Sequence, residues 1–378
     1  MPGNMELSFL TFIVTNDCNF NCAYCFQEKD KTTIAPATIE KAVEFFYPFL
    51  KQESTVDFYG GEPLLAFDRV RHTVACVLEK NRQGNKQIQF NLTTNGSLIT
   101  EEILEFFAGH RFGLLLSFDG LAQEQSRKAG TLDHMVKTLE RFRHYPGIDL
   151  EINSVFTPRT VTALTGSVRF LVESGCANIT FNIDTMEEWR PEDLETFTLE
   201  LNRLTDYLVS LYRETGHNPV SNFRGFIPGN SGTGDRFEKK RGIFRCYAAK
   251  DRVAVTPEGK LWGCYLFHDF FKSRPDHPQY EDYYLGTLEE FIAAEGNMKT
   301  GVSRSYSELR MDYFQAEQGY CFLCKEVAGC VVCPVNAAYS SGNLGKIPRR
   351  ICELIKIQRN AQEEFRQKLS LPDPATTK

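Results

Sequence analysis

The chain has 378 residues, of which 42% are hydrophobic and 24% are charged, and its formal net charge is −6. This composition is typical of globular proteins and excludes a disordered chain. The acidic balance disfavours a general nucleic-acid binder, which would carry a basic face. No apolar run reaches the roughly 18 residues that a membrane-spanning helix needs. Residues 1–6 show no basic segment before an apolar core, so we expect no secretory signal and a cytoplasmic location.

The first half of the chain alternates short apolar runs with amphipathic segments. The apolar runs predict strands at 7–15, 55–59, 88–93, 112–118, 150–156 and 178–183. The amphipathic segments predict helices at 36–50, 68–82, 100–110, 132–144 and 160–174. Repeats of this kind imply parallel strands joined by right-handed crossovers. Eight repeats would close a TIM barrel, so the six found here predict an α/β fold with a partial (β/α)6 TIM-like barrel.

Polar and glycine residues follow these predicted strands, at the rim where such barrels carry their functional groups. They are Gly60, Gly61, Glu62 and Pro63 after the second strand, Asn95 after the third, Ser117 and Asp119 after the fourth, and Asn153 on the fifth. Because parallel strands end at one rim, we expect these residues to line one pocket.

Three cysteines follow the first predicted strand at C-x3-C-x2-C spacing: Cys18, Cys22 and Cys25. Thiolates this close together on a loop are able to face one metal centre. Three ligands suit a four-iron cluster and leave one iron with an open position. A structural zinc site needs four ligands, and the next Cys or His is His72. The spacing therefore predicts an iron–sulfur cluster with a vacant site.

After the sixth strand the pattern loosens into a bridge at 191–245, with a helix predicted at 192–215. Its segment 229–234 has the glycine content of a phosphate loop. It follows no strand and lacks the G-K-[ST] ending, which disfavours a nucleotide site there.

The last part of the chain, 246–378, is rich in cysteine. It contains Cys246, Cys264, Cys321, Cys324, Cys330, Cys333 and Cys352, which are too many ligands for one metal site and one short of two four-ligand sites. A hairpin is predicted at 252–264 with Cys264 on its second strand, and a final helix at 353–368. A zinc ribbon at 321–333 is the alternative, although it leaves Cys246 and Cys264 without a purpose. The remaining two of the 12 cysteines, Cys76 and Cys176, stand alone, and we expect them to be small buried apolar side chains.

These features resemble the radical S-adenosylmethionine (SAM) enzymes. The resemblance rests on the C-x3-C-x2-C loop after a first strand, on Tyr24 before its third cysteine, and on the Gly60–Pro63 motif after the second strand. The cysteines of 246–352 resemble the SPASM domain of that superfamily, which holds two auxiliary iron–sulfur clusters. We therefore expect a radical SAM barrel at 1–190, a bridge at 191–245 and a small α+β SPASM domain with a C-terminal helix at 246–378.

The resemblance implies roles for the residues at the rim. Cys18, Cys22 and Cys25 would bind the 4Fe-4S cluster whose open iron holds SAM. Gly60 and Gly61 would let backbone carbonyls approach the methionyl ammonium, and Glu62 would accept from that cation or cap the loop. The backbone of Tyr24 would meet the adenine. The remaining groups would hold the ribose hydroxyls or the carboxylate of SAM: Asn95, Ser117, Asp119, Arg127 and Asn153.

The SPASM resemblance implies two further 4Fe-4S clusters. Cys321, Cys324, Cys330 and Cys352 would bind the outer cluster, and Cys246, Cys264 and Cys333 the inner one. Here the last pair is C-x2-C where C-x3-C is common, and a fourth inner ligand is not evident. Either the inner cluster has an open iron, or another residue or the substrate completes it. Tyr247, Tyr265 and His268 are near in sequence.

The resemblance implies a peptide maturase that forms a carbon–carbon or thioether crosslink in a ribosomally made precursor peptide. Its partners would be that peptide and an electron donor such as flavodoxin or ferredoxin, with no nucleic acid and no membrane. An anaerobic sulfatase-maturating enzyme is the alternative. Members of that group place an Asp directly after the cysteine equivalent to Cys264, where this chain has Tyr265. An iron–sulfur electron-transfer protein is the non-enzyme alternative, but it leaves Gly60–Pro63 unexplained. Only 17 residues precede Cys18, so we expect no separate leader-binding module.

Overall fold

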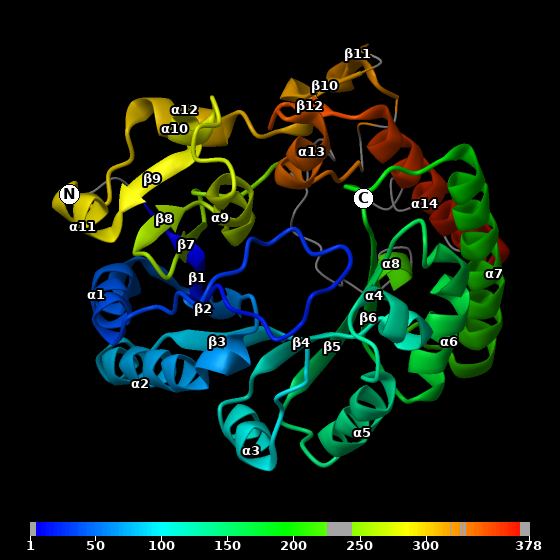
Figure 1. Ribbon diagram of the computed structural model, residues 1–378, viewed down its shortest axis with the longest axis horizontal. Coiled ribbons are helices and arrows are strands. Elements are labelled where there is room, and N and C mark those ends of the chain that lie inside the picture. Colours follow the sequence, from blue (N-terminus) through cyan, green and yellow to red (C-terminus); the bar gives the residue numbers. More distant parts are fainter. Residues whose placement is uncertain (1–4, 225–243, 318, 326, 328–329, 371–378) are drawn as a thin grey trace.

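A nine-stranded sheet organises the molecule, in the order β6-β5-β4-β3-β2-β1-β7-β8-β9 (Figure 1). The computed structural model describes residues 5–224, 244–317, 319–325, 327 and 330–370. The segment 229–234 and the tail from 371, both considered above, lie outside the described residues. No helix within the described part is long and apolar enough to cross a membrane.

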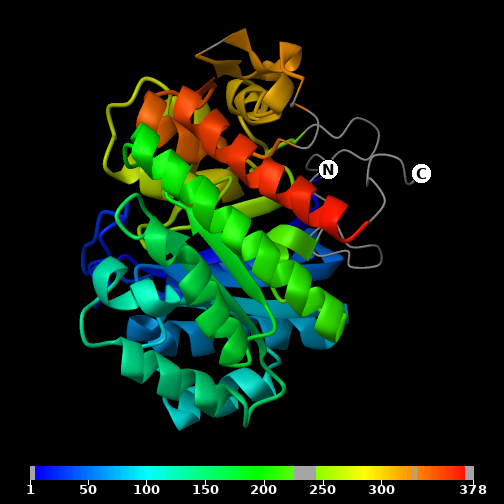
Figure 2. The same ribbon diagram turned by 90° about the vertical axis from the view of Figure 1, so that its right-hand side faces the viewer.

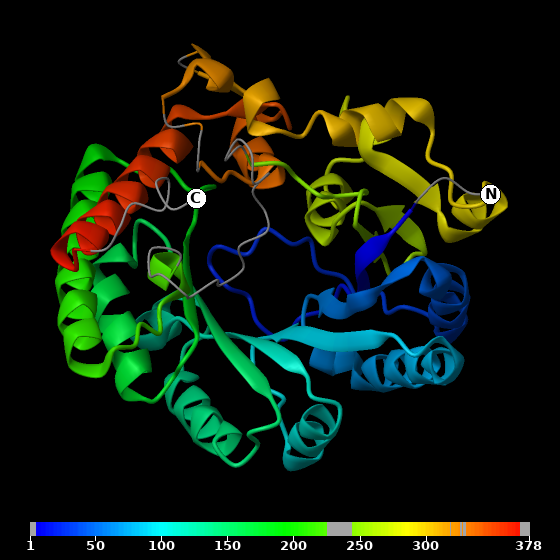
Figure 3. The same ribbon diagram turned by 180° about the vertical axis from the view of Figure 1, so that it is seen from behind.

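Six parallel strands form the partial barrel that the sequence predicts. They are β1 (Leu7–Thr15), β2 (Leu50–Gly60), β3 (Gln87–Thr94), β4 (Gly113–Ser117), β5 (Asp149–Phe156) and β6 (Ile179–Ile183). The helices lie outside the curved sheet (Figure 3): α1 (Pro36–Phe46), α2 (Phe67–Gly84), α3 (Glu101–Gly109), α4 (Gln123–Ser126), α5 (Leu132–Phe142) and α6 (Leu164–Glu173). Helix α1 ends earlier than the predicted 36–50. Pro48 follows it in a 3-10 turn, Tyr47–Phe49, because proline cannot continue the helical hydrogen bonds.

The strands bury one face and keep the other polar. Val56, Phe58, Phe90 and Leu92 belong to the main core beneath the helices. Side chains alternate along a strand, so the residues between them, such as Asp57, point into the barrel. This inner face leads up to the rim that carries the predicted site.

The sheet continues beyond the barrel because β7 (Arg252–Val255) pairs in parallel with β1. Strands β8 (Lys260–Trp262) and β9 (Tyr284–Thr287) then add in antiparallel order. The predicted hairpin is present, but Cys264 follows β8 rather than lying on it. The N–H of Gly263 donates to the Tyr306 hydroxyl at 2.9 Å, so the strand ladder has already ended there.

The remaining elements lie along the side of the molecule to which β7, β8 and β9 extend the sheet (Figure 1). They are α9 (Tyr265–Lys272), α10 (Tyr280–Tyr283), α11 (Leu288–Ala293), α12 (Thr300–Ser307) and α13 (Pro334–Ser341), with a small sheet of β10 (Gln315–Ala316), β11 (Gly319–Tyr320) and β12 (Lys346–Ile347). The long helices α7 (Pro191–Thr215) and α14 (Arg349–Lys368) pack side by side (Figure 2). Leu354, Ala361 and Phe365 of α14 share a core with α6, α7 and the short α8 (Ser221–Arg224). The C-terminal helix thus ties the cysteine-rich part to the last repeat of the barrel.

Candidate metal and cofactor site

The loop between β1 and α1, residues 16–33, carries the first three cysteines and lies across the barrel mouth (Figure 1). We call it the Cys18 loop. The N–H of Ala23 donates to the carbonyl of Ser126 at 2.8 Å, and the N–H of Asn16 donates to that of Thr32 at 2.9 Å. Backbone hydrogen bonds therefore hold both ends and the middle of the loop.

The three thiols of this loop form one group. Burial raises the pKa of Cys18, and it raises that of Cys22 to about 11, while the neighbouring Cys25 raises both further. The Cys18 Sγ accepts from the Phe20 N–H at 3.4 Å and from Asn95 Nδ2 at 4.0 Å. N–H donors to sulfur are a feature of iron–sulfur sites. Half-buried thiols with such donors fit a cluster that would take them as thiolates.

Gly60 and Gly61 are required by the approach of two backbones. A Cβ on Gly61 would lie 2.2 Å from the Asp17 carbonyl oxygen, and one on Gly60 would lie 2.2 Å from that of Thr15. Their segment hydrogen-bonds to the start of the Cys18 loop, Gly61 N–H to Thr15 at 2.9 Å and Glu62 N–H to Asp17 at 2.8 Å. The approach of their backbone carbonyls to SAM, which the resemblance implies, would be a second role of these two glycines.

Glu62 caps the loop, which was one of its two predicted roles. It is fully buried, and its carboxylate accepts from the Leu64 N–H at 3.0 Å, the Thr94 hydroxyl at 2.8 Å and the Asn95 N–H at 2.7 Å. Burial raises its pKa to about 7, against the effect of these donors. Pro63 is buried and opens the 3-10 turn Pro63–Ala66.

Asp119 and Arg127 form a fully internal pair beside the Cys18 loop. Asp119 is 0% exposed and accepts from Arg127 at 2.8 Å, the Tyr24 hydroxyl at 2.9 Å, the Ser126 hydroxyl at 2.5 Å and the Val155 N–H at 2.9 Å. These four donors show that Asp119 has an internal role, and its predicted contact with SAM stays a prediction. Arg127 pairs with Asp119 rather than standing free for a ligand carboxylate. Its buried Nε has no hydrogen-bond partner among the described residues, which leaves this donor for a bound group.

Three further polar residues lie at the rim as predicted: Asn95, Ser117 and Asn153. They differ in how many of their hydrogen-bonding groups already have partners in the protein. The Asn95 side chain donates to Asn19 at 2.9 Å and accepts from the Ser97 hydroxyl at 2.6 Å. The Asn153 side chain accepts from Asn182 at 2.6 Å. Half-buried Ser117 has no side-chain hydrogen bond within the described chain. Of the polar rim groups, Ser117 is therefore the most open to a ligand.

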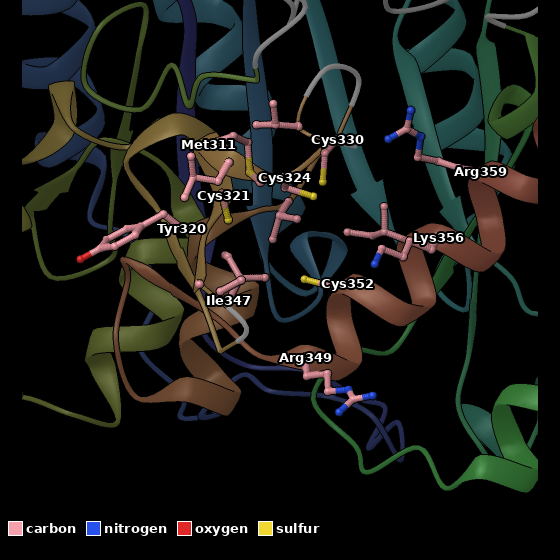
Figure 4. Close-up of a pocket in the computed structure, with 16 residues that line it drawn as sticks. Met311, Tyr320, Cys321, Cys324, Cys330, Ile347, Arg349, Cys352, Lys356 and Arg359 are labelled. Carbon is pink, nitrogen blue, oxygen red and sulfur yellow. The ribbon is translucent and has the colours of Figure 1, made fainter.

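Four thiols of the last part of the chain line one cavity of about 280 Å3 (Figure 4). They are Cys321, Cys324, Cys330 and Cys352, the set predicted to bind the outer cluster. Burial raises the pKa of Cys321 to about 11 and that of Cys330 to about 12, and the nearby Cys352 raises both. No three His, Cys, Asp or Glu side chains of the described residues converge closely enough for a single metal ion. Thiols spread around a cavity fit a polynuclear cluster better than one zinc with Zn–S bonds of about 2.3 Å.

The other three thiols of this part form a separate group. Burial raises the pKa of Cys246 and Cys264 to about 11; the nearby Cys333 raises the first and Cys246 raises the second. Cys333 directly precedes α13. None of the three side chains named near them in the sequence is established as a fourth ligand. His268 turns away to the Cys18 loop, where its Nε2 lies 3.4 Å from Asn16 Oδ1. All ten predicted ligands are thus brought into three groups, and their binding of iron stays a prediction.

Asp269 was not among the residues predicted from the sequence, and the structure places it against the Cys18 loop and the end of β2. Its carboxylate is 4% exposed and accepts from Gln27 of the Cys18 loop at 3.3 Å and from the Tyr59 hydroxyl at 3.4 Å. The signal available in the sequence was a polar pair, His268-Asp269, inside an aromatic helix. Such a pair is conspicuous because buried charges need partners.

The chain is similar to radical SAM enzymes in sequence. Residues 12–161 match the model of the radical SAM superfamily. The chain is 22% identical to the radical SAM cyclopropyl synthase TigE of Paramaledivibacter caminithermalis, over 93% of this chain and 73% of the relative. It is 24% identical to the cysteine-type anaerobic sulfatase-maturating enzyme of Clostridium novyi, over 77% of this chain and 79% of the relative. The solved structure of anSMEcpe with bound AdoMet and the Cp18Cys peptide has the same fold, with a TM-score of 0.73 at 18% identity, covering 97% and 99% of the two chains.

Proposed function

We propose that this chain, a radical SAM enzyme with a 4Fe-4S cluster and SAM as cofactors, is a maturase that crosslinks a ribosomally made peptide through a carbon–carbon or thioether bond. Its partners would be that precursor peptide and an electron donor such as flavodoxin or ferredoxin. The observation that carries the proposal is the grouping of ten thiols into three sets, one of them at the barrel mouth.

In the proposed reaction the protein's part is positioning. Bound SAM and its cluster supply a 5′-deoxyadenosyl radical that abstracts a substrate hydrogen. Cys18, Cys22 and Cys25 would hold the cluster, and Phe20 and Asn95 would donate to its sulfur ligand. The Asp119–Arg127 pair and the Tyr24 hydroxyl fix the loop against β4 and β5. Gly60 and Gly61 keep β2 in contact with the start of the same loop.

Two further sites are part of the proposal. Cys321, Cys324, Cys330 and Cys352 would bind an outer auxiliary cluster, and Cys246, Cys264 and Cys333 an inner one. A substrate that loses two hydrogens needs an electron acceptor, and auxiliary clusters would provide one. A fourth ligand of the inner cluster would come from another residue or from the substrate.

Formylglycine formation is the second candidate. Similarity to a sulfatase-maturating enzyme favours it, and the missing Asp at position 265 counts against it. Similarity to a radical SAM cyclopropyl synthase over 93% of this chain favours formation of a new bond. The two candidates would share the cluster and SAM sites, and they differ in the substrate and in the reaction carried out on it.

Iron content and SAM cleavage together test the proposal. The variant Cys18→Ala/Cys22→Ala/Cys25→Ala should lose the iron of one cluster, keep that of the other two and form no 5′-deoxyadenosine. Cys76→Ala and Cys176→Ala are matched controls, because these cysteines belong to none of the three groups, and their iron content should equal that of the wild type. Reconstituted wild-type protein that forms no 5′-deoxyadenosine under reduction would overturn the proposal. Loss of all iron in the triple variant would contradict the division into three sites.

A further inference from the structure

We infer that Asp269 is the group that accepts the proton lost by the substrate when the new bond forms. The inference rests on the proposed function and adds a catalytic residue to it.

Asp269 lies where three parts of the chain meet. Gln27 comes from the Cys18 loop, Tyr59 from the end of β2, and Asp269 from α9. Both donors reach the same oxygen, Oδ2. The other oxygen, Oδ1, has no hydrogen-bond partner among the described residues, so it is open to a substrate group.

Aromatic side chains connect this carboxylate to two of the thiol groups. The Tyr59 and Tyr265 rings are 3.9 Å apart, and the Tyr339 ring lies 5.2 Å from that of Phe26 on the Cys18 loop. Burial raises the pKa of Tyr339 well above its usual value, and the charges of Asp269, Cys25 and Cys333 add to this effect while Arg274 opposes it. Asp269 itself accepts from Gln27, two residues after Cys25, and it lies on α9, which begins directly after Cys264. Asp269 is therefore placed against the Cys18 loop, on the helix that follows a thiol of the inner group.

The electrostatic surroundings suit a proton acceptor at neutral pH. Burial raises the pKa of Asp269 to about 7, against the hydrogen bonds from Gln27 and Tyr59 and the charge of Lys272. Tyr265, Tyr339 and Cys264 face the same carboxylate from α9, α13 and the end of the hairpin. A base is most effective when its pKa lies near the working pH.

The proposed reaction needs such a group for its balance. Joining a carbon to a second atom X removes one hydrogen from each. The hydrogen on carbon leaves as an atom to the deoxyadenosyl radical. The hydrogen on X leaves as a proton to Asp269, and the remaining electron passes to a one-electron acceptor of the iron–sulfur class. The C–H and X–H bonds break, the C–X bond forms, and charge is conserved.

The test compares Asp269→Asn with Asp269→Glu and with Asp276→Asn, which makes the same change at an exposed position just beyond α9. The probes are the peptide encoded by the reading frame beside this gene and a peptide carrying a sulfatase maturation-site cysteine. We expect Asp269→Asn to keep its iron and its 5′-deoxyadenosine formation but to lower crosslinked product per 5′-deoxyadenosine at least about 100-fold. Asp269→Glu should recover part of that ratio, and Asp276→Asn should equal the wild type.

A second measurement does not depend on turnover. The infrared spectrum of the apo-protein should contain a protonated-carboxyl band that is absent in Asp269→Asn and that vanishes as the pH rises through about 7. An unchanged product ratio in Asp269→Asn would overturn the inference, as would parallel loss of iron and 5′-deoxyadenosine, which would show a purely structural role. Wild-type protein that cleaves SAM but modifies neither peptide would instead overturn the proposed substrate class.

Discussion

At the scale of single residues, Gly61 illustrates how closely the site is packed. Its Cα faces the backbone of Asp17, the residue before the first cysteine, with no room for a Cβ. We predict that Gly61→Ala lowers the free energy of unfolding by about 1–3 kcal/mol through overpacking and weakens SAM binding. Denaturant unfolding and equilibrium binding of SAM would measure the two effects.

Gly109→Ala is the control for this change. Gly109 ends α3, and nothing lies within 4 Å of the position of its Cβ. Its free energy of unfolding should change by less than about 1 kcal/mol. Equal effects of the two substitutions would contradict the explanation from close packing.

The ionised form of Asp57 destabilises the folded state. Burial raises its pKa to about 6, although Arg252 and the hydrogen bonds with Asn91 and Thr11 lower it. A carboxyl with a raised pKa in the folded state stabilises the fold while it is protonated, and this contribution is lost as the pH rises through that pKa. We predict that Asp57→Asn gains stability relative to the wild type between about pH 4 and pH 7, by on the order of 2 kcal/mol. Unfolding curves at pH 4 and pH 8 would show this, and a difference independent of pH would contradict it.

At the scale of elements, α9 holds the Cys18 loop in place. Lys272 at its end pairs with Asp30 at 2.6 Å and donates to the Glu28 carbonyl at 2.8 Å. Partial burial works to raise the pKa of Asp30, but the hydrogen bonds from Lys272 and Thr32 outweigh it and lower the pKa. Asn16 adds a bond to Glu258 at 2.7 Å, next to the β7–β8 turn. The second half of the chain thus shapes the loop that the first half carries.

We predict that Lys272→Met increases amide hydrogen exchange in the Cys18 loop, above all around residues 28–32. The overall free energy of unfolding should fall by no more than about 1 kcal/mol, because the pair is partly exposed. Hydrogen exchange followed by mass spectrometry would measure the change. Lys41→Met removes an exposed pair with Glu289 and should leave exchange in the loop unaltered. Unchanged exchange in Lys272→Met would show that α9 does not hold the loop.

Individual helices and strands can be predicted well from this sequence. The barrel strands and most barrel helices follow from periodicity, because each repeat buries one face and exposes the other. The four cysteines that the resemblance grouped together line one cavity, and their binding of a cluster stays a prediction. What could not be predicted are the partners of polar groups. Asp119 was expected to face a ligand, and Glu62 either to face one or to cap the loop. Their donors from Asn95, just after β3, and from Val155 on β5 come from parts of the chain that sequence spacing does not place.

At the scale of the whole molecule, contacts between elements far apart in the sequence could not be predicted either. No local pattern indicates that β7 joins the free edge of β1, or that α14 packs along α7, because neither contact is between neighbours in sequence. Both matter for the site. The first attaches the hairpin before Cys264 to the strand before Cys18, and the second attaches the helix of Cys352 to the barrel.

The pairing of β1 with β7 also sets an order of events during synthesis. Phe9 pairs with Arg252 and Phe12 with Val255. The partner of the first strand, β7, is therefore synthesised much later than the strand itself. Until then its outer edge offers unpaired N–H and C=O groups to any other strand. Contacts this distant in sequence slow folding, and exposed edges promote aggregation. The nascent chain is therefore most prone to aggregation after the six-repeat barrel has been synthesised and before the β7–β8 hairpin covers the edge of β1.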